Sequence, residues 1–177
     1  MNSRKIYWLI LVVAVAAGNE EYINGIGMPA CATKAVAVGA SWDSGPDVDT
    51  PAYFSNRGEL LDVYAPGIWI TAPRWSGDPE GSGLYLTAAG TSSAAPHVAG
   101  AAADIFQMLG PTATVAEVSA RLTRTGIQIV DPATGVGTPR IDLVRAMANE
   151  PTAGPELIVT AVSSTSSSGL QGAAMGV

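Results

Sequence analysis

Residues 90–100, GTSSAAPHVAG, carry the residue types best suited to covalent chemistry in this sequence. They place Ser92 where an uncharged, alanine-rich helix is expected to begin. The first N–H groups of a helix have no partner within the helix and lie at the positive end of its dipole. A serine hydroxyl there is suited to nucleophilic attack, with its own N–H directed at a developing oxyanion. The structural alternative is that Thr91 or Ser92 only caps the helix.

Pro96 and His97 limit what this segment can do. Proline has no N–H, so we expect Pro96 within about the first four positions of the helix. His97 is the only histidine of the chain. Five residues along a helix correspond to about 140° of rotation and roughly 7.5 Å of rise, so His97 cannot be the general base for Ser92. We expect His97 to pack or to make a structural hydrogen bond.

Short apolar segments around this helix predict the sheet that positions it. Strands are expected near residues 35–38, 60–64, 68–71 and 84–87, with Gly39 ending the first of them. Helices are expected over residues 94–109, 115–124 and 141–148. Thr114 and Glu117 form a capping box for the second helix, and Gly126 ends it. Strands followed by helices indicate an α/β domain.

The N-terminal segment has two interpretations. A short basic start precedes 12 apolar residues, 6–17, which are too few to cross a bilayer as a helix because that takes about 20. The segment resembles a signal peptide in its basic start and small residues. Alternatively, residues 9–15 form a buried strand of a parallel sheet, which ends at a Gly-Asn turn. In the second interpretation, which we favour, Met1 is an internal or artificial start.

Composition excludes several function classes. The chain has 177 residues, 47% of them hydrophobic and 14% charged, which suits one globular domain. Its net charge is -6 and it has no run of Lys or Arg, so we expect neither nucleic acid nor a membrane as a partner. The single cysteine, Cys31, cannot form an internal disulfide and has no companions at metal-ligand spacing.

The composition changes near the C-terminus. Residues 149–156 are typical of a linker because they combine proline and glycine. Residues 157–177 begin with a β-prone apolar stretch and continue as a Ser/Thr tract. We expect this tail to be either disordered or the first strand of a truncated second domain, since one strand cannot form a domain.

Several blocks, taken together and in this order, resemble the subtilisin-like serine proteases (subtilases). They are VAAGNE at residues 15–20, PAC at 29–31, AVGA at 37–40, FSNRG at 54–58, LDVYAPG at 61–67, the GTSSAAPHVAG segment and RID at 140–142. The resemblance covers about residues 8–148. It implies that residues 1–148 are a partial catalytic domain with a three-layer α/β fold, whose parallel sheet is incomplete at its N-terminal side. The tail resembles the first strand of adhesion-related β-sandwich domains that follow bacterial secreted proteases.

The resemblance assigns catalytic roles to two residues. Ser92 would be the nucleophile of a peptide-bond hydrolysis that passes through an acyl-enzyme. The N–H of Ser92 and the side chain of Asn19 would form the oxyanion hole, where the loss of one donor typically costs about 10²- to 10³-fold in rate. Asn19 has a structural alternative as a turn residue after Gly18.

The same resemblance implies binding sites. Ala16, Ala17 and Gly18 would line the pocket for a substrate side chain, and Gly90 would let the substrate backbone pass closely. Asp62, with backbone carbonyls near residues 33 and 35, would form a calcium site like one found in some subtilases. Calcium takes six to eight oxygen ligands, and the default for a single carboxylate is solvation. No cofactor is required by the expected chemistry.

The departures from the family define the alternatives. Subtilases need an Asp block and a His-Gly-Thr-His block upstream, and nothing in this sequence resembles them. We therefore expect the general base to come from a missing N-terminal half, and the chain alone to lack triad activity. The leading hypothesis is a fragment of a secreted serine endopeptidase. The alternatives are an inactive remnant that serves as a binding or structural module, and a serine hydrolase with an acidic base, as in the sedolisins.

Overall fold

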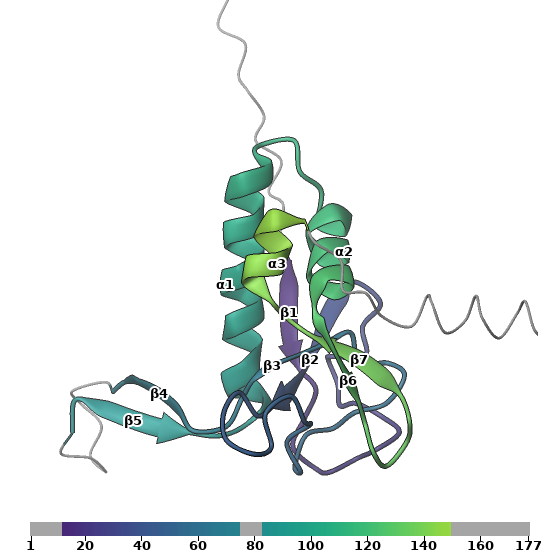
Figure 1. Ribbon diagram of the computed structural model, residues 1–177, viewed down its shortest axis with the longest axis vertical. Coiled ribbons are helices and arrows are strands. Elements are labelled where there is room, and N and C mark those ends of the chain that lie inside the picture. The colour runs from purple at the N-terminus through teal and green to yellow at the C-terminus, as the bar shows by residue number, and fades with distance from the viewer. Residues whose placement is uncertain (1–11, 75–82, 150–177) are drawn as a thin grey trace, which may run out of the picture.

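The computed structural model describes residues 12–74 and 83–149 of the chain. Within these residues the elements follow one another as β1 (Val13–Ala16), β2 (Ala35–Ser41), β3 (Val63–Pro66), β4 (Ile70–Pro73), β5 (Tyr85–Ala88), α1 (Thr91–Leu109), α2 (Val115–Thr125), β6 (Ile127–Val130), β7 (Gly137–Arg140) and α3 (Leu143–Ala148). Figure 1 shows α1 running along the main sheet with α2 and α3 beside it. The predicted α/β class is confirmed.

The main sheet is mostly parallel and places β1 at one edge. Its five strands lie in the order β1-β2-β3-β7-β6. The pairs β1–β2, β2–β3 and β3–β7 are parallel, and β6–β7 is antiparallel. Strands β4 and β5 form a separate antiparallel hairpin, which extends away from the sheet near the first turn of α1 (Figure 1). The carboxyl end of β1 leads directly into Gly18 and Asn19.

Alternating side chains of the central strands fill two separate cores. Successive residues of a strand point to opposite faces, and β2 sends Val36 and Val38 to the helical face but Ala37 to the other. In the same way β3 sends Val63 to the helical face and Tyr64 to the other. Strands buried on both faces read as continuous apolar runs, which explains the sequence of β2. On the face opposite the helices, burial and the charge of Asp131 raise the pKa of the Tyr64 hydroxyl.

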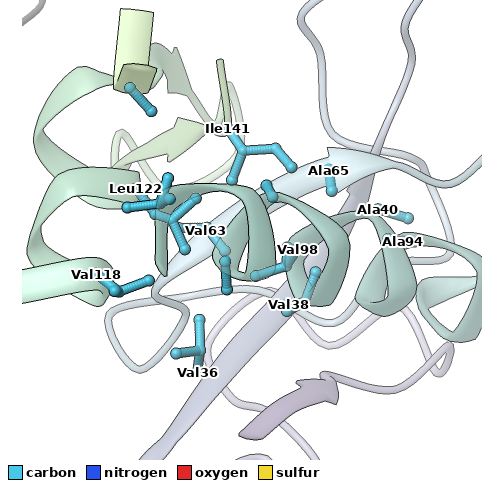
Figure 2. Close-up of a cluster of buried hydrophobic side chains, with 14 of the residues drawn as sticks. Val36, Val38, Ala40, Val63, Ala65, Ala94, Val98, Val118, Leu122 and Ile141 are labelled. Atoms are coloured by element: carbon cyan, nitrogen blue, oxygen red, sulfur yellow. The ribbon is translucent and has the colours of Figure 1, made fainter. Parts of the chain in front are cut away.

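Helix α1 packs closely because its buried positions are mostly small. Figure 2 shows Ala94 and Val98 of α1 in one cluster with Val38 and Ala40 of β2. Leu122 of α2 extends the same cluster, so all three helices cover one face of the sheet in the described residues. This packing fixes the N-terminal end of α1 next to the carboxyl end of β1.

The predicted elements are found, but two strands are shifted: the one predicted near 60–64 is β3 at 63–66, and the one near 68–71 is β4 at 70–73. The capping box of Thr114 and Glu117 is present at the start of α2, and Gly126 follows its last residue. Gly39 was predicted to end this strand, but it lies inside β2. A Cβ on Gly39 would be 2.7 Å from the Tyr64 ring, so the glycine makes room for that side chain. The β6–β7 hairpin is an addition that the sequence did not predict.

The N-terminal and C-terminal predictions are only partly within the described residues. Val13–Ala16 is a strand paired in parallel with β2, which confirms the strand interpretation for this part of the predicted segment 9–15. Residues 1–11 lie outside the described residues. So does nearly all of the predicted linker 149–156, together with the predicted tail 157–177. Among the described residues no helix is long and apolar enough to cross a membrane.

Candidate active site

The fold brings together two segments that are about seventy residues apart in the sequence, the loop after β1 and the first turn of α1. The Asn19 Oδ1 atom accepts hydrogen bonds from the Thr91 backbone N–H at 2.9 Å and from the Thr91 hydroxyl at 3.0 Å. The Thr91 hydroxyl oxygen in turn accepts from the Gly18 N–H at 3.2 Å. Thr91 is fully buried, so it links the loop to the helix without contact with solvent.

These bonds fix the orientation of the Asn19 amide. A backbone N–H can only donate, so the side-chain atom that meets the Thr91 N–H must be the oxygen. The amide nitrogen, Nδ2, is left on the outer side, and the described residues offer it no hydrogen-bond acceptor. Asn19 is therefore held with its amide nitrogen available as a donor. The turn-residue alternative predicted for Asn19 does not account for its two bonds to Thr91.

The position over Gly90 borders both predicted catalytic groups. A Cβ on Gly90 would lie 3.2 Å from Ser92 Oγ, 3.6 Å from Asn19 Nδ2 and 3.8 Å from Asn19 Oδ1. Gly90 has a φ of 152°, which favours glycine, so the space stays free of a side chain. The Ser92 N–H also lacks a hydrogen-bond partner among the described residues. The Ser92 hydroxyl and the Asn19 side-chain amide thus meet over Gly90.

Ser92 lies in the first turn of α1, as the GTSSAAPHVAG segment predicts, although the helix begins earlier than the predicted range 94–109. It begins at Thr91, because the Gly90 carbonyl accepts from the N–H groups of Ser93 and Ala94 at 3.0 and 3.3 Å. Pro96 is therefore the sixth helical residue, and its expected place within the first four positions is wrong. Since proline has no N–H, the Ser92 carbonyl loses its usual partner four residues on.

His97 has a structural role, as predicted. Its Nδ1 atom lies 2.9 Å from the Ser93 carbonyl oxygen, one turn back along α1. The histidine is exposed and makes no hydrogen bond to Ser92 in the described part of the chain. No histidine therefore hydrogen-bonds to the Ser92 hydroxyl among these residues.

An apolar pocket of about 390 Å³ opens beside Ser92. One wall is the inner face of the β4–β5 hairpin, and the other is the first two turns of α1. Its lining residues are Ile70, Ala72, Leu86, Ala88, Ser92, Ser93, Pro96 and His97. The sequence alone assigned no role to the hairpin. The sequence feature that could have indicated this role is the alternation of apolar residues with Thr71 and Thr87. These two threonines point to the opposite, exposed face of the hairpin.

The residues predicted to line a substrate side-chain pocket lie in different environments. Ala16 and Gly18 are half-buried, next to Asn19. Ala17 is fully buried in the core with Ala37 and Leu61, so its side chain does not face a substrate. Gly18 has a φ of 107°, and a Cβ there would lie 2.3 Å from the Asn56 side chain, so only glycine fits.

Asp62 does not assemble a cation site from the side chains described. Its Oδ2 atom accepts a hydrogen bond from the Ala37 N–H at 2.7 Å, which leaves one carboxylate oxygen for a ligand. No group of three or more acidic, histidine or cysteine side chains comes together within residues 12–74 and 83–149. Calcium would need six to eight oxygens, nearly all of them backbone carbonyls. The residues present fit such an ion poorly.

Comparisons with known proteins identify the family. The sequence pattern that defines the subtilase family matches residues 2–168. The chain belongs to the subtilase family. The subtilase-type proteinase isp6 of Schizosaccharomyces pombe is 39% identical over 134 residues, which are 76% of this chain and 27% of that protein. An extracellular serine proteinase of a Thermus species is 41% identical over 112 residues, 63% of this chain and 25% of that protein.

A solved protease structure also matches this fold. A protease from Pseudoalteromonas arctica superposes with a TM-score of 0.59 and 36% identity, over 78% of this chain and 42% of that one. This subtilase chain spans about a quarter of the length of the curated relatives described above. The family and this structural match support the mostly parallel α/β sheet.

Proposed function

We propose that this chain is part of a serine endopeptidase in which Ser92 is the nucleophile. The Ser92 Oγ attacks the carbonyl carbon of a peptide bond, and a general base takes its proton. The Ser92 N–H and Asn19 Nδ2 donate hydrogen bonds to the oxyanion that forms. The base then passes the proton to the leaving amine as the C–N bond breaks, and water hydrolyses the acyl-enzyme.

The observation that carries this proposal is the common position of the two groups around Gly90. One point lies 3.2 Å from Ser92 Oγ and 3.6 Å from Asn19 Nδ2, and no side chain fills it. A reacting carbonyl must be in reach of both the nucleophile and the oxyanion donors. The two hydrogen bonds from Thr91 hold the Asn19 oxygen, which leaves the amide nitrogen available to donate to such a carbonyl.

The proposed partners follow from what the described residues leave uncovered. The substrate is a polypeptide, with Gly90 and the half-buried Ala16 and Gly18 beside its path. The general base would be a histidine from an N-terminal half of the catalytic domain. That half would add a strand beside β1, which is an edge of the described sheet, and would cover the exposed small residues Ala99 and Ala103 of α1.

Location is a further part of this proposal, and the calcium site predicted at Asp62, which its surroundings fit poorly, has a test of its own. We propose that the enzyme is secreted, in line with the extracellular Thermus relative. Calcium at Asp62 stays a prediction, and a melting temperature measured with calcium and with a chelator tests it. A rise with calcium in the parent but not in an Asp62→Asn variant would support the site, and equal melting temperatures would exclude it.

The test is proteolysis by the complete protein. The coding DNA upstream of Met1, read in the same frame, shows whether an Asp block and a His-Gly-Thr-His block precede this chain. The protein so defined is then assayed on casein as the parent, as Ser92→Ala and as Ser93→Ala. Ser93 is the matched control, because it neighbours Ser92 on the same helical turn and also borders the pocket.

We expect Ser92→Ala to abolish hydrolysis and Ser93→Ala to retain most of it. Activity that survives Ser92→Ala would refute the proposal. A stop codon just upstream, with neither block in the gene, would instead mean that the chain is a remnant in which Ser92 keeps its geometry without a base.

A further inference from the structure

Asn56 is a fully buried residue in the segment between β2 and β3, and its side chain binds the loop that carries Asn19. The Asn56 Oδ1 atom accepts hydrogen bonds from the N–H groups of Glu20 and Tyr22, at 3.0 and 3.1 Å. The Asn56 Nδ2 atom donates to the Ala17 carbonyl at 3.0 Å and to the Glu20 carboxylate at 2.6 Å. One amide thus binds the loop on both sides of Asn19.

Backbone hydrogen bonds reinforce this attachment. The Asn56 N–H donates to the Gly18 carbonyl at 3.0 Å, and the Arg57 N–H donates to the Tyr22 carbonyl at 2.8 Å. The segment that carries Asn56 is itself anchored, because the Arg57 guanidinium pairs at 2.9 Å with Asp131, whose side chain is 3% exposed. The loop after β1 is therefore held by the anchored segment that carries Asn56 and Arg57. Asn19 is the loop residue that turns away from this segment towards α1.

The contact between the Asn56 side chain and the loop leaves the loop backbone little conformational freedom. A Cβ on Gly18 would lie 2.3 Å from Asn56 Nδ2, so the loop backbone passes directly over the amide. Each hydrogen-bonding group of the Asn56 side chain has a partner, in a site without exposure to solvent. Replacing the amide by a methyl group would leave the Glu20 and Tyr22 N–H groups unpaired, and the loop would have to move to find other partners.

We propose that Asn56 is a positioning residue for the oxyanion hole, acting through Asn19. It holds residues 17–22 so that Thr91 can bind the Asn19 oxygen and leave Nδ2 directed at the space over Gly90. This inference rests on the proposed function, because it concerns the rate of the same reaction. Oxyanion donors are effective only at short distances from the developing charge, so a shift of about 1 Å in the loop lowers the rate.

The experiment is a double-mutant cycle in the complete protease. Asn56→Ala is measured alone, and again in a protein that already carries Asn19→Ala. We expect Asn56→Ala to lower kcat by about 10- to 100-fold with KM within about twofold. In the Asn19→Ala background the same change should lower kcat by less than about twofold, since the donor that Asn56 positions is already absent.

Ser55 provides the matched control. It is buried beside Asn56. Its hydroxyl accepts from the Ala40 N–H at 3.0 Å and donates to the Asn56 backbone carbonyl at 3.1 Å, but it makes no hydrogen bond to the loop after β1 in the described residues. Ser55→Ala should lower the melting temperature and leave kcat within about twofold of the parent. An equal loss of kcat from Asn56→Ala in both backgrounds, or a comparable loss from Ser55→Ala, would show that Asn56 is merely structural and overturn the proposal.

A conservative exchange adds a rescue. Asn56→Asp keeps the acceptor for the two N–H groups, loses both donated bonds and places a carboxylate against Glu20. Adding Glu20→Gln restores a donor opposite the new carboxylate, so kcat should recover at least about fivefold relative to Asn56→Asp alone. No recovery would contradict the proposed hydrogen bonds.

A readout without activity separates this proposal from the proposed function. If the parent shows no Ser92-dependent hydrolysis, the proposed function fails. The side-chain NH₂ signals of Asn19 in an NMR spectrum then still report on Asn56. In Asn56→Ala we expect each of the two signals to move to the chemical shift that it has in a mobile asparagine side chain. Unchanged signals would overturn the positioning role.

Discussion

Thr91 decides which end of the Asn19 amide faces Ser92. Its backbone N–H and its hydroxyl both donate to Asn19 Oδ1, and the hydroxyl oxygen also accepts from the Gly18 N–H. Because a side-chain amide can turn over at small cost, two donors on the oxygen side are what keep Nδ2 outward. Thr91, the residue before Ser92, therefore sets the orientation of the proposed oxyanion donor.

The hydroxyl part of this role can be tested alone. Thr91→Val keeps the shape and the backbone N–H but removes the hydroxyl, so we expect kcat of the complete protease to fall about 5- to 10-fold, the value of roughly one hydrogen bond. Thr91→Ser keeps the hydroxyl and should stay within about twofold of the parent. Equal kcat values for the valine and serine variants would contradict the role of the hydroxyl.

At the scale of elements, α2 owes its start to a capping box with a pH dependence. The Glu117 carboxylate accepts from the Thr114 N–H at 2.7 Å and from the Thr114 hydroxyl at 2.9 Å. These hydrogen bonds lower the pKa of Glu117 below its ordinary value. A folded-state pKa below the unfolded one means that the stabilisation is complete above the ordinary carboxyl pKa and is lost as the pH falls through the folded-state value.

We therefore expect Glu117→Gln to lower the melting temperature of the complete protein at about pH 7 and to have little effect at about pH 3. Thr114→Ala should cost about 1 kcal/mol at neutral pH, as is usual for a lost N-cap. Glu59→Gln serves as the control, since the exposed Glu59 has no hydrogen bond among the described residues. A decrease for Glu117→Gln that is the same at both pH values would contradict this account of the cap.

The elements also show how far the sequence could be read. Local sequence patterns were enough to predict α2, because its capping box lies within four residues. They were also enough to predict the central part of β2. Gly39 was misassigned because the Tyr64 ring that requires a glycine there comes from another strand. The β6–β7 hairpin contains Gly137 and Pro139, and its pairing depends on the sheet edge offered by β3.

The candidate site follows the same rule. Ser92, Asn19 and Gly90 were assigned from short motifs, and the structure places them around one space. Asn56 had no assigned role beyond its motif, since its four side-chain bonds go to residues more than thirty positions earlier. Pro96 was predicted to lie closer to the start of α1 than it does. The first helical residue, Thr91, donates its N–H to Asn19, and this contact between distant segments is not visible in the local sequence.

At the scale of the whole molecule, the described residues leave an edge and a helix face open. β1 is an edge of the main sheet in the described residues, with Val13 44% exposed, and α1 exposes the small residues Ala99 and Ala103. Unpaired strand edges and apolar faces promote association. This pattern fits a chain that is completed by further sequence of the same domain.

We accordingly expect the isolated 177-residue chain to aggregate or to be partly molten. Size-exclusion chromatography and thermal unfolding by near-ultraviolet circular dichroism would show large species or no cooperative transition. The complete protein, under the same conditions, should elute as a defined species and melt sharply. A reversible two-state melt of the isolated monomer would contradict this expectation.

The most direct measurement of the central claim is covalent labelling of the nucleophile. The complete protein is treated with diisopropyl fluorophosphate, in which the serine oxygen displaces fluoride from phosphorus, and its peptides are mapped by mass spectrometry. We predict one adduct per chain, on Ser92, with a lower labelling rate in Asn19→Ala and no adduct in Ser92→Ala. Absence of labelling, or an adduct on any other residue, would contradict the assignment of Ser92 as the nucleophile.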